Sequence, residues 1–134
     1  SPTGQTIEQE APASRARALR KRILLVDDQQ TVREAILLLL GLDGHTVIEA
    51  ENGAAALELF RRDRFDLVIT DFEMPVMKGN ELAVRIKKLS PSQPVLMMTA
   101  YAERLSGSDN PVDRILDKPF RFQDLRQAMV ELLC

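Results

Sequence analysis

Five polar residues that could act together stand at the ends of short aliphatic runs in this sequence, namely Asp27, Asp28, Asp71, Thr99 and Lys118. Each one alone has an ordinary structural explanation, such as a helix cap, a strand-end hydroxyl or a solvated lysine. The aliphatic runs favour buried strands, and parallel strands bring their carboxyl ends to one edge of a sheet. Together the five residues therefore predict one polar site at that edge.

The residue types at this edge favour phosphoryl transfer assisted by a divalent cation. Carboxylates about 4 Å apart repel by about 4 kcal/mol per pair at an effective dielectric near 20, so three of them need a compensating cation. Mg²⁺, or Mn²⁺ in its place, prefers such oxygen ligands, and Lys118 offers a further positive charge. An aspartate can itself be the nucleophile and form an acyl phosphate. Asp71 is the candidate, because its strand would lie between the acidic pair and the strands of Thr99 and Lys118.

The elements that must position these residues follow from the hydrophobic pattern. Aliphatic runs predict five strands, at Ile23–Val26, Thr46–Ala50, Leu67–Thr70, Val95–Met98 and about Arg114–Leu116. Segments of helical period lie between them. Their expected inward faces are Val32, Ala35, Ile36, Leu39 and Leu40, then Ala56, Leu57 and Phe60, then Leu82, Ile86 and Leu89, and last Phe122, Leu125, Met129 and Leu132.

The boundaries of the helices are also marked in the sequence. Gly44 is a natural stop for the first helix and Asn52 a cap for the second, while the third is expected from about Gly79 to Leu89. Alternation of strand and helix predicts a single flavodoxin-like (βα)5 domain of the α/β class. Its five-stranded parallel sheet would have the order 2-1-3-4-5 with helices on both faces. In that order the tips of strands 1, 3, 4 and 5 are neighbours.

Composition and charge restrict the class of protein. The 134 residues are 45% apolar and 28% charged, as expected for one soluble domain. Residues 1–20 hold few large apolar side chains and predict a disordered tail or linker, which leaves 21–134 as the domain. A net charge of −2 and a pI near 5.5 disfavour nucleic acid and anionic membranes as direct partners. The sequence has no long apolar run and no apolar signal segment, which predicts a cytoplasmic protein.

Four motifs, in this order, resemble the response-regulator receiver domain of bacterial two-component signalling. They are VDD at 26–28, TDFEMPVMKG at 70–79, MTA at 98–100 and DKPF at 117–120. The resemblance extends from about Lys21 to the C-terminus. It implies a phosphoprotein of a two-component or phosphorelay system, which receives its phosphoryl group from the phosphohistidine of a histidine kinase or a histidine phosphotransfer protein.

The resemblance also implies a role for each site residue. Asp71 would be the phosphoacceptor, and the Mg²⁺ ligands would be Asp27, Asp28, Asp71 and the main-chain carbonyl of Glu73. Lys118 would pair with the phosphoryl group, and the bond that joins it to the following proline would be cis. Thr99 would move to hydrogen-bond the phosphoryl group, and this movement would change the surface offered to partners. The domain would catalyse only its own phosphorylation and dephosphorylation.

Two positions depart from the pattern of the family. Three residues before the lysine, where many receiver domains carry Tyr or Phe, this sequence has Ile115. Tyr101 and Phe120 are the candidates to replace the missing aromatic residue. The segment Arg104–Val112 contains a glycine and a proline, which predicts a short or irregular fourth helix.

Two other functions stay open as alternatives. A receiver-like interaction module would not take phosphate, although all five site residues are present. A phosphatase of the haloacid-dehalogenase type would also use an aspartate nucleophile and Mg²⁺, but its Asp-x-Asp motif is absent because Glu73 stands two residues after Asp71. His45, the only histidine, is interpreted as a surface residue.

The downstream effector and the stimulus have no signature in the sequence. The sequence ends one helix after DKPF. It is therefore expected to be a stand-alone regulator, the receiver of a hybrid histidine kinase, or a fragment of a larger protein.

Overall fold

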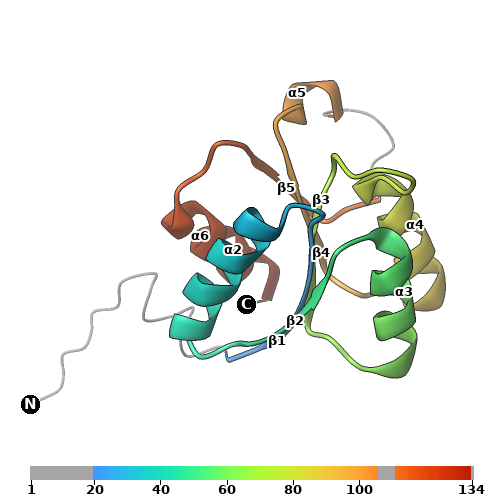
Figure 1. The fold of residues 1–134 in the computed structure, drawn as a ribbon, viewed down its shortest axis with the longest axis horizontal. Coiled ribbons are helices and arrows are strands. Elements are labelled where there is room, and N and C mark those ends of the chain that lie inside the picture. The colour runs from blue at the N-terminus through green and yellow to red at the C-terminus, as the bar shows by residue number, and fades with distance from the viewer. Residues whose placement is uncertain (1–19, 106–110, 134) are drawn as a thin grey trace, which may run out of the picture.

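Strands and helices alternate along the described part of the chain, which comprises residues 20–105 and 111–133 of a computed structural model (Figure 1). The strands are β1 (Arg22–Val26), β2 (Thr46–Ala50), β3 (Leu67–Asp71), β4 (Val95–Thr99) and β5 (Arg114–Asp117). The helices are α2 (Gln30–Leu42), α3 (Gly53–Arg62), α4 (Gly79–Leu89), α5 (Ala102–Leu105) and α6 (Phe122–Leu133). The predicted strands are confirmed, each within one residue of its expected limits.

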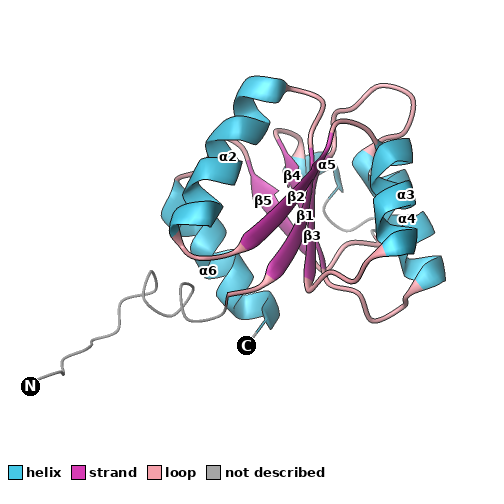
Figure 2. Ribbon diagram, turned by 60° about the horizontal axis from the view of Figure 1, so that its bottom comes forward, coloured by secondary structure: helices cyan, strands magenta, loops and turns pink. Residues whose placement is uncertain are grey.

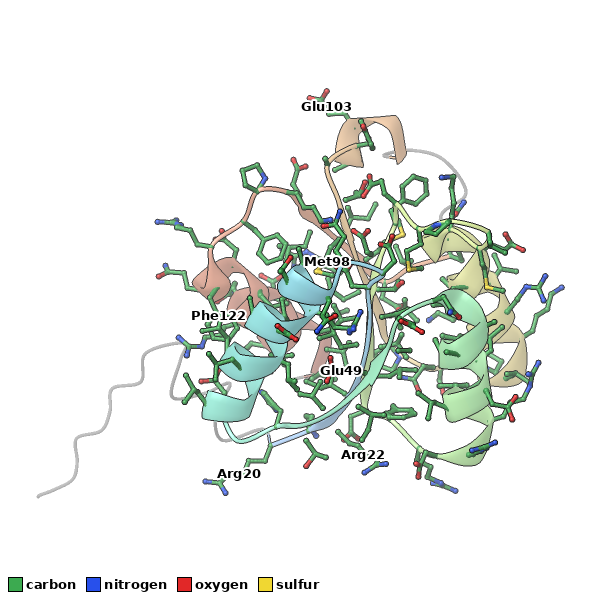
Figure 3. The ribbon with its side chains drawn as sticks, in the orientation of Figure 1. Arg20, Arg22, Glu49, Met98, Glu103 and Phe122 are labelled. Atoms are coloured by element: carbon green, nitrogen blue, oxygen red, sulfur yellow. The ribbon has the colours of Figure 1, made fainter. Side chains whose placement is uncertain are left out.

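The sheet has the predicted topology. Its order is β2-β1-β3-β4-β5, and every neighbouring pair is parallel. In the registers, Val26 of β1 lies opposite Thr70 of β3, and Thr99 of β4 lies opposite Asp117 of β5. The carboxyl ends of these four strands therefore meet at one edge, where the sequence predicts the site. Figure 3 shows Glu103 of α5 at this end of the molecule and Arg22 at the opposite end.

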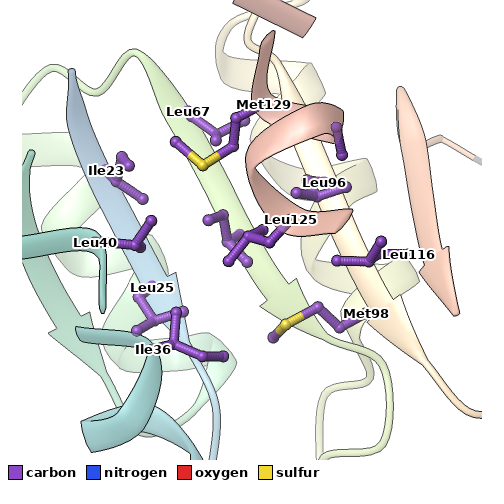
Figure 4. Close-up of a cluster of buried hydrophobic side chains, with 12 residues drawn as sticks. Ile23, Leu25, Ile36, Leu40, Leu67, Leu96, Met98, Leu116, Leu125 and Met129 are labelled. Atoms are coloured by element: carbon purple, nitrogen blue, oxygen red, sulfur yellow. The ribbon is translucent and has the colours of Figure 1, made fainter. Parts of the chain in front are cut away.

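Helices cover both faces of the sheet, as predicted. Helices α2 and α6 lie on one face, and α3 and α4 lie on the other (Figure 2). Successive side chains of a strand point to opposite faces of the sheet. Ile23 and Leu25 therefore pack under α2 and α6 (Figure 4), while Leu24 and Val26 pack under α3 and α4. A sheet buried on both faces explains why the strands read as continuous aliphatic runs.

The predicted helix boundaries agree with the structure. The Asn52 side chain accepts a hydrogen bond of 2.7 Å from the N–H of Ala55 and so caps α3. Gly44, with φ of +90°, follows the end of α2 in the left-handed conformation that favours glycine. Of the expected fourth helix, α5 forms a single turn, and residues 106–110 lie outside the described residues, as do residues 1–19 of the predicted tail.

Two residues that were expected to face the core are exposed. The buried stripe of α2 is centred on Ile36 and Leu40, and Ala35 lies outside it. Leu89 is half exposed, because it lies in the last turn of α4 at the edge of the buried stripe formed by Leu82 and Ile86. Both differences follow from the 100° rotation per residue, which leaves only a narrow stripe against the sheet.

An ion pair between a buried carboxylate and a partly buried guanidinium joins the end of α2 to α6. The fully buried Asp43 accepts two hydrogen bonds from the Arg126 guanidinium, of 2.7 Å to Oδ2 and 2.8 Å to Oδ1. The same guanidinium lies 4.3 Å from the centre of the Phe122 ring. This fork geometry holds the two helices in one register on their face of the sheet.

The interpretation of His45 as a surface residue is wrong, because the side chain is buried beside this ion pair. Its Nδ1 accepts a hydrogen bond of 2.9 Å from the N–H of Lys21, at the start of β1. Burial lowers the pKa of His45, while the nearby Asp43 carboxylate acts in the opposite direction. The imidazole is therefore a neutral packing group that satisfies one backbone donor.

Candidate functional site

Three aspartates meet at the carboxyl edge of the sheet. Side-chain oxygens of Asp27, Asp28 and Asp71 lie within 4.8 Å of one another. Asp27 and Asp71 are buried, while Asp28 is exposed. The three residues meet at the edge that the sequence predicts, because Asp27 and Asp28 are the first two residues after β1 and Asp71 is the last residue of β3.

The donor set at this edge fits a hard divalent cation. Asp27 Oδ1 accepts a hydrogen bond of 2.9 Å from the N–H of Gln29, but its buried Oδ2 has no hydrogen-bond partner among the described residues. Burial raises the pKa of Asp27. A buried carboxylate oxygen without a donor is costly in free energy, and a cation shared with Asp28 and Asp71 would satisfy it.

Lys118 supplies the positive charge that the three aspartates lack. Its Nζ donates a hydrogen bond of 2.5 Å to Asp71 Oδ1, and the bond to Pro119 is cis, as predicted. Burial raises the pKa of Asp71 to about 6, although Lys118 acts to lower it. Burial alone would lower the pKa of Lys118, but the carboxylates of Asp71, Asp27 and Glu73 raise it. The lysine therefore stays charged beside the central aspartate.

Thr99 is at the site but is not bonded to Asp71. Its buried hydroxyl donates a hydrogen bond of 2.8 Å to Glu73 Oε2 and accepts one of 3.0 Å from the N–H of Tyr101. Glu73 Oε1 lies 3.9 Å from Lys118 Nζ. The sequence assigned the main-chain carbonyl of Glu73 to the metal and predicted no contact between its side chain and Thr99, although an acid two residues beyond the strand end could have pointed to one.

The loop from β3 to α4 fits tightly around the backbone of Asp71. The N–H of Gly79 donates to the carbonyl of Phe72 at 3.1 Å, and the N–H of Phe72 donates to the carbonyl of Met98 at 2.9 Å. A Cβ on Gly79 would overlap the carbonyl oxygen of Asp71 and lie 3.0 Å from Phe72 Cα. Only glycine fits here, and Met74 of the same loop is buried in the core under α3 and α4.

Val76, in the same loop, has a strained backbone. Its φ is +71°, which a β-branched residue rarely adopts, and its side chain is fully exposed. The valine therefore gains no burial to offset the strain.

Replacing Val76 with asparagine is expected to raise the free energy of unfolding by about 1 kcal/mol, because asparagine tolerates positive φ far better than valine. Urea denaturation of both proteins measures the difference. Val84→Asn is the matched control, because Val84 is partly exposed on helix α4, and a change within about 0.5 kcal/mol is expected there. A Val76→Asn variant no more stable than wild type would contradict the assigned strain.

The aromatic residue that would replace the one missing at Ile115 stays a prediction. Ile115 is half-buried on β5. Tyr101 is 46% exposed beside the Thr99 hydroxyl, whereas Phe120 packs against the core under α2 and α6.

Comparison with known proteins assigns this fold and site to a family. The sequence model of the response regulator receiver domain matches residues 23–130, so the chain belongs to that family. A phosphorylation-dependent signalling switch is the standard role of this family, whose members bind Mg²⁺ at an acidic pocket.

Particular relatives include the response regulator MprA of Mycobacterium ulcerans, which is 37% identical over 84% of this chain and 50% of its own length. The chain thus spans about half the length of the curated relatives it matches.

Two solved structures are also similar. The response regulator TrrA of Thermotoga maritima, in complex with Mg²⁺ and BeF, is 38% identical over 84% of this chain and 99% of its own, with a TM-score of 0.78. TrrA in its complex with the histidine kinase ThkA gives 37% identity over 85% of this chain and 99% of its own, with a TM-score of 0.76.

Within residues 20–105 and 111–133, no helix has both the length and the apolar character that a membrane span requires.

Proposed function

We propose that Asp71 is the phosphoacceptor of this receiver domain and that its phosphodonor is the phosphohistidine of a histidine kinase or histidine phosphotransfer protein. The observation that carries the proposal is the bond of 2.5 Å between Lys118 Nζ and Asp71 Oδ1, at a buried strand end that also holds Asp27 and Asp28. The solved complex of TrrA with ThkA supports a donor of this class. The domain would extend over residues 21–134, and residues 1–20 would be a tail or linker.

The transfer follows from the chemistry of the carboxylate. One Asp71 oxygen forms a bond to phosphorus while the phosphorus–nitrogen bond of the donor breaks, and the electron pair of that bond returns to the donor imidazole. Lys118 already lies at Asp71 and would pair with the phosphoryl oxygens. Burial of Asp71 excludes water from the attacking oxygen before transfer.

The residues that would hold Mg²⁺ are Asp27, Asp28, Asp71 and the main-chain carbonyl of Glu73. The bound ion would neutralise charge on the phosphoryl oxygens. Asp27 and Asp28 offer carboxylate oxygens that lie within 4.8 Å of those of Asp71. They position the acceptor and are not themselves candidates for phosphorylation, because Lys118 donates only to Asp71 among the three.

Intact-mass measurement after incubation with acetyl phosphate tests the acceptor. Wild type should gain one phosphoryl group only when Mg²⁺ is present, and Asp71→Asn should gain none. Asp63→Asn should behave like wild type, because this exposed aspartate follows the end of α3 and pairs with Arg22, at the end of the molecule opposite the three aspartates. Labelling of Asp71→Asn would disprove the assignment. A wild type that neither gains mass nor forms a Mg²⁺-dependent beryllofluoride complex would favour the interaction module.

A further inference from the structure

The Glu73 side chain lies beside Thr99 and Lys118, the two residues that would bind the phosphoryl group in the proposed function. Glu73 Oε2 accepts the Thr99 hydroxyl proton at 2.8 Å, and Glu73 Oε1 lies 3.9 Å from Lys118 Nζ. The side chain is 32% exposed, so it can leave toward solvent without opening the core. Glu73 is thus an internal anion that is bonded to Thr99 and lies beside Lys118, the two groups that a phosphoryl group would need.

The hydroxyl of Thr99 cannot serve two acceptors at once. A hydroxyl has a single proton to donate, and here that proton goes to Glu73. The Thr99 oxygen in turn accepts the N–H of Tyr101 at 3.0 Å. Because Thr99 is fully buried, no solvent is available to replace a lost partner. The threonine must therefore release Glu73 before it can bond to a phosphoryl group on Asp71.

Charge reinforces this competition. A phosphoryl group adds about −1.5 to −2 charge and three strong acceptor oxygens. It would form two residues from the Glu73 carboxylate, in a cluster that already holds Asp27 and Asp28. The two anions repel, so the phosphorylated domain favours a position of Glu73 away from Thr99 and Lys118.

We infer that Glu73 is a positioning residue that holds the unphosphorylated arrangement of Thr99 and Lys118, and that phosphorylation must displace its carboxylate to switch the domain. This inference rests on the proposed function of Asp71. It goes beyond that function because it states what holds the unphosphorylated domain in its conformation, namely the Glu73 carboxylate, which competes with the phosphoryl group for Thr99 and Lys118. Glu73 thereby sets how strongly the domain resists switching.

The test compares Glu73→Ala and Glu73→Gln with wild type by NMR. In the metal-free protein, the amide resonance of Tyr101 reports on the Thr99 oxygen, to which that amide is bonded. We expect Glu73→Ala to shift this resonance and Glu73→Gln, which keeps an uncharged acceptor for Thr99, to leave it near the wild-type position. Glu81→Gln, at an exposed glutamate paired with Arg85 on α4, is the matched control.

Titration with beryllofluoride at saturating Mg²⁺ then measures the competition. The half-saturating concentration should fall about tenfold in Glu73→Ala, since a charged acceptor no longer holds the two donors, and less in Glu73→Gln. In a Thr99→Val background the effect of Glu73→Ala should shrink, because only the contact with Lys118 remains.

The outcomes separate this inference from the proposed function. A wild type that forms no complex and gains no phosphoryl group would overturn both. Two results would overturn the role of Glu73 alone. One is that wild type and Glu73→Ala form the beryllofluoride complex with the same half-saturating concentration. The other is that Glu73→Ala does not move the Tyr101 amide resonance. An equal change in Glu81→Gln would attribute the effect to net charge and would also overturn that role.

Discussion

Arg126→Met is expected to lower the free energy of unfolding by about 3 to 5 kcal/mol, because it leaves the fully buried carboxylate of Asp43 without its guanidinium. Methionine keeps an unbranched apolar side chain over the Phe122 ring, so the loss reports mainly on the removed ion pair with Asp43. Urea denaturation monitored by circular dichroism measures it.

The control for this prediction is another arginine paired with a carboxylate on a helix. Arg85 is 53% exposed and pairs with Glu81 one turn away, so Arg85→Met should cost less than about 0.5 kcal/mol. Combining Arg126→Met with Asp43→Asn should recover part of the loss, since the buried charge is then removed. A loss no larger for Arg126→Met than for Arg85→Met would show that the Asp43 charge is compensated by other groups.

Gly79→Ala is expected to slow phosphorylation from acetyl phosphate about 100-fold and to destabilise the domain by about 1 to 3 kcal/mol. The new Cβ would meet backbone atoms, the carbonyl oxygen of Asp71 and Cα of Phe72, and neither can move without shifting the acceptor. The rate of Mg²⁺-dependent mass gain and the urea midpoint measure the two effects.

Gly53→Ala is the matched control, because it also starts a helix at this edge and also lacks room for a Cβ. There the new atom would lie 2.6 Å from the sulfur of Met77, in a flexible side chain that can adopt another rotamer. We expect the phosphorylation rate to change by less than about threefold. Equal losses of rate in both variants would mean that the position of the Asp71 backbone does not limit the transfer.

The fold and the acidic edge were predictable because their signals are local. A strand buried on both faces reads as an aliphatic run, and the next polar residue marks its end, as Asp27 and Asp71 do. Once the strand order is set, residues at the ends of neighbouring strands must meet. The cap at Asn52 and the stop at Gly44 are local for the same reason.

The features that sequence reasoning missed depend on distant partners. Asp43 and Arg126 lie 83 positions apart, and neither residue type is expected in a buried place. His45 was interpreted as a surface residue, and its hydrogen bond with the N–H of Lys21 joins residues 24 positions apart. The contact of Glu73 with Thr99 depends on side-chain rotamers in a loop, which spacing along the chain does not determine.

The parallel ladders also determine how this chain must fold. Ile23 pairs with Leu67, and Val68 pairs with Val95, so each rung joins residues with a whole helix or more between them. Closing such loops costs chain entropy before the first inter-strand hydrogen bond forms. The domain should therefore reach its native state more slowly than a helical bundle of similar length, and its central strands should assemble in a concerted step rather than hairpin by hairpin.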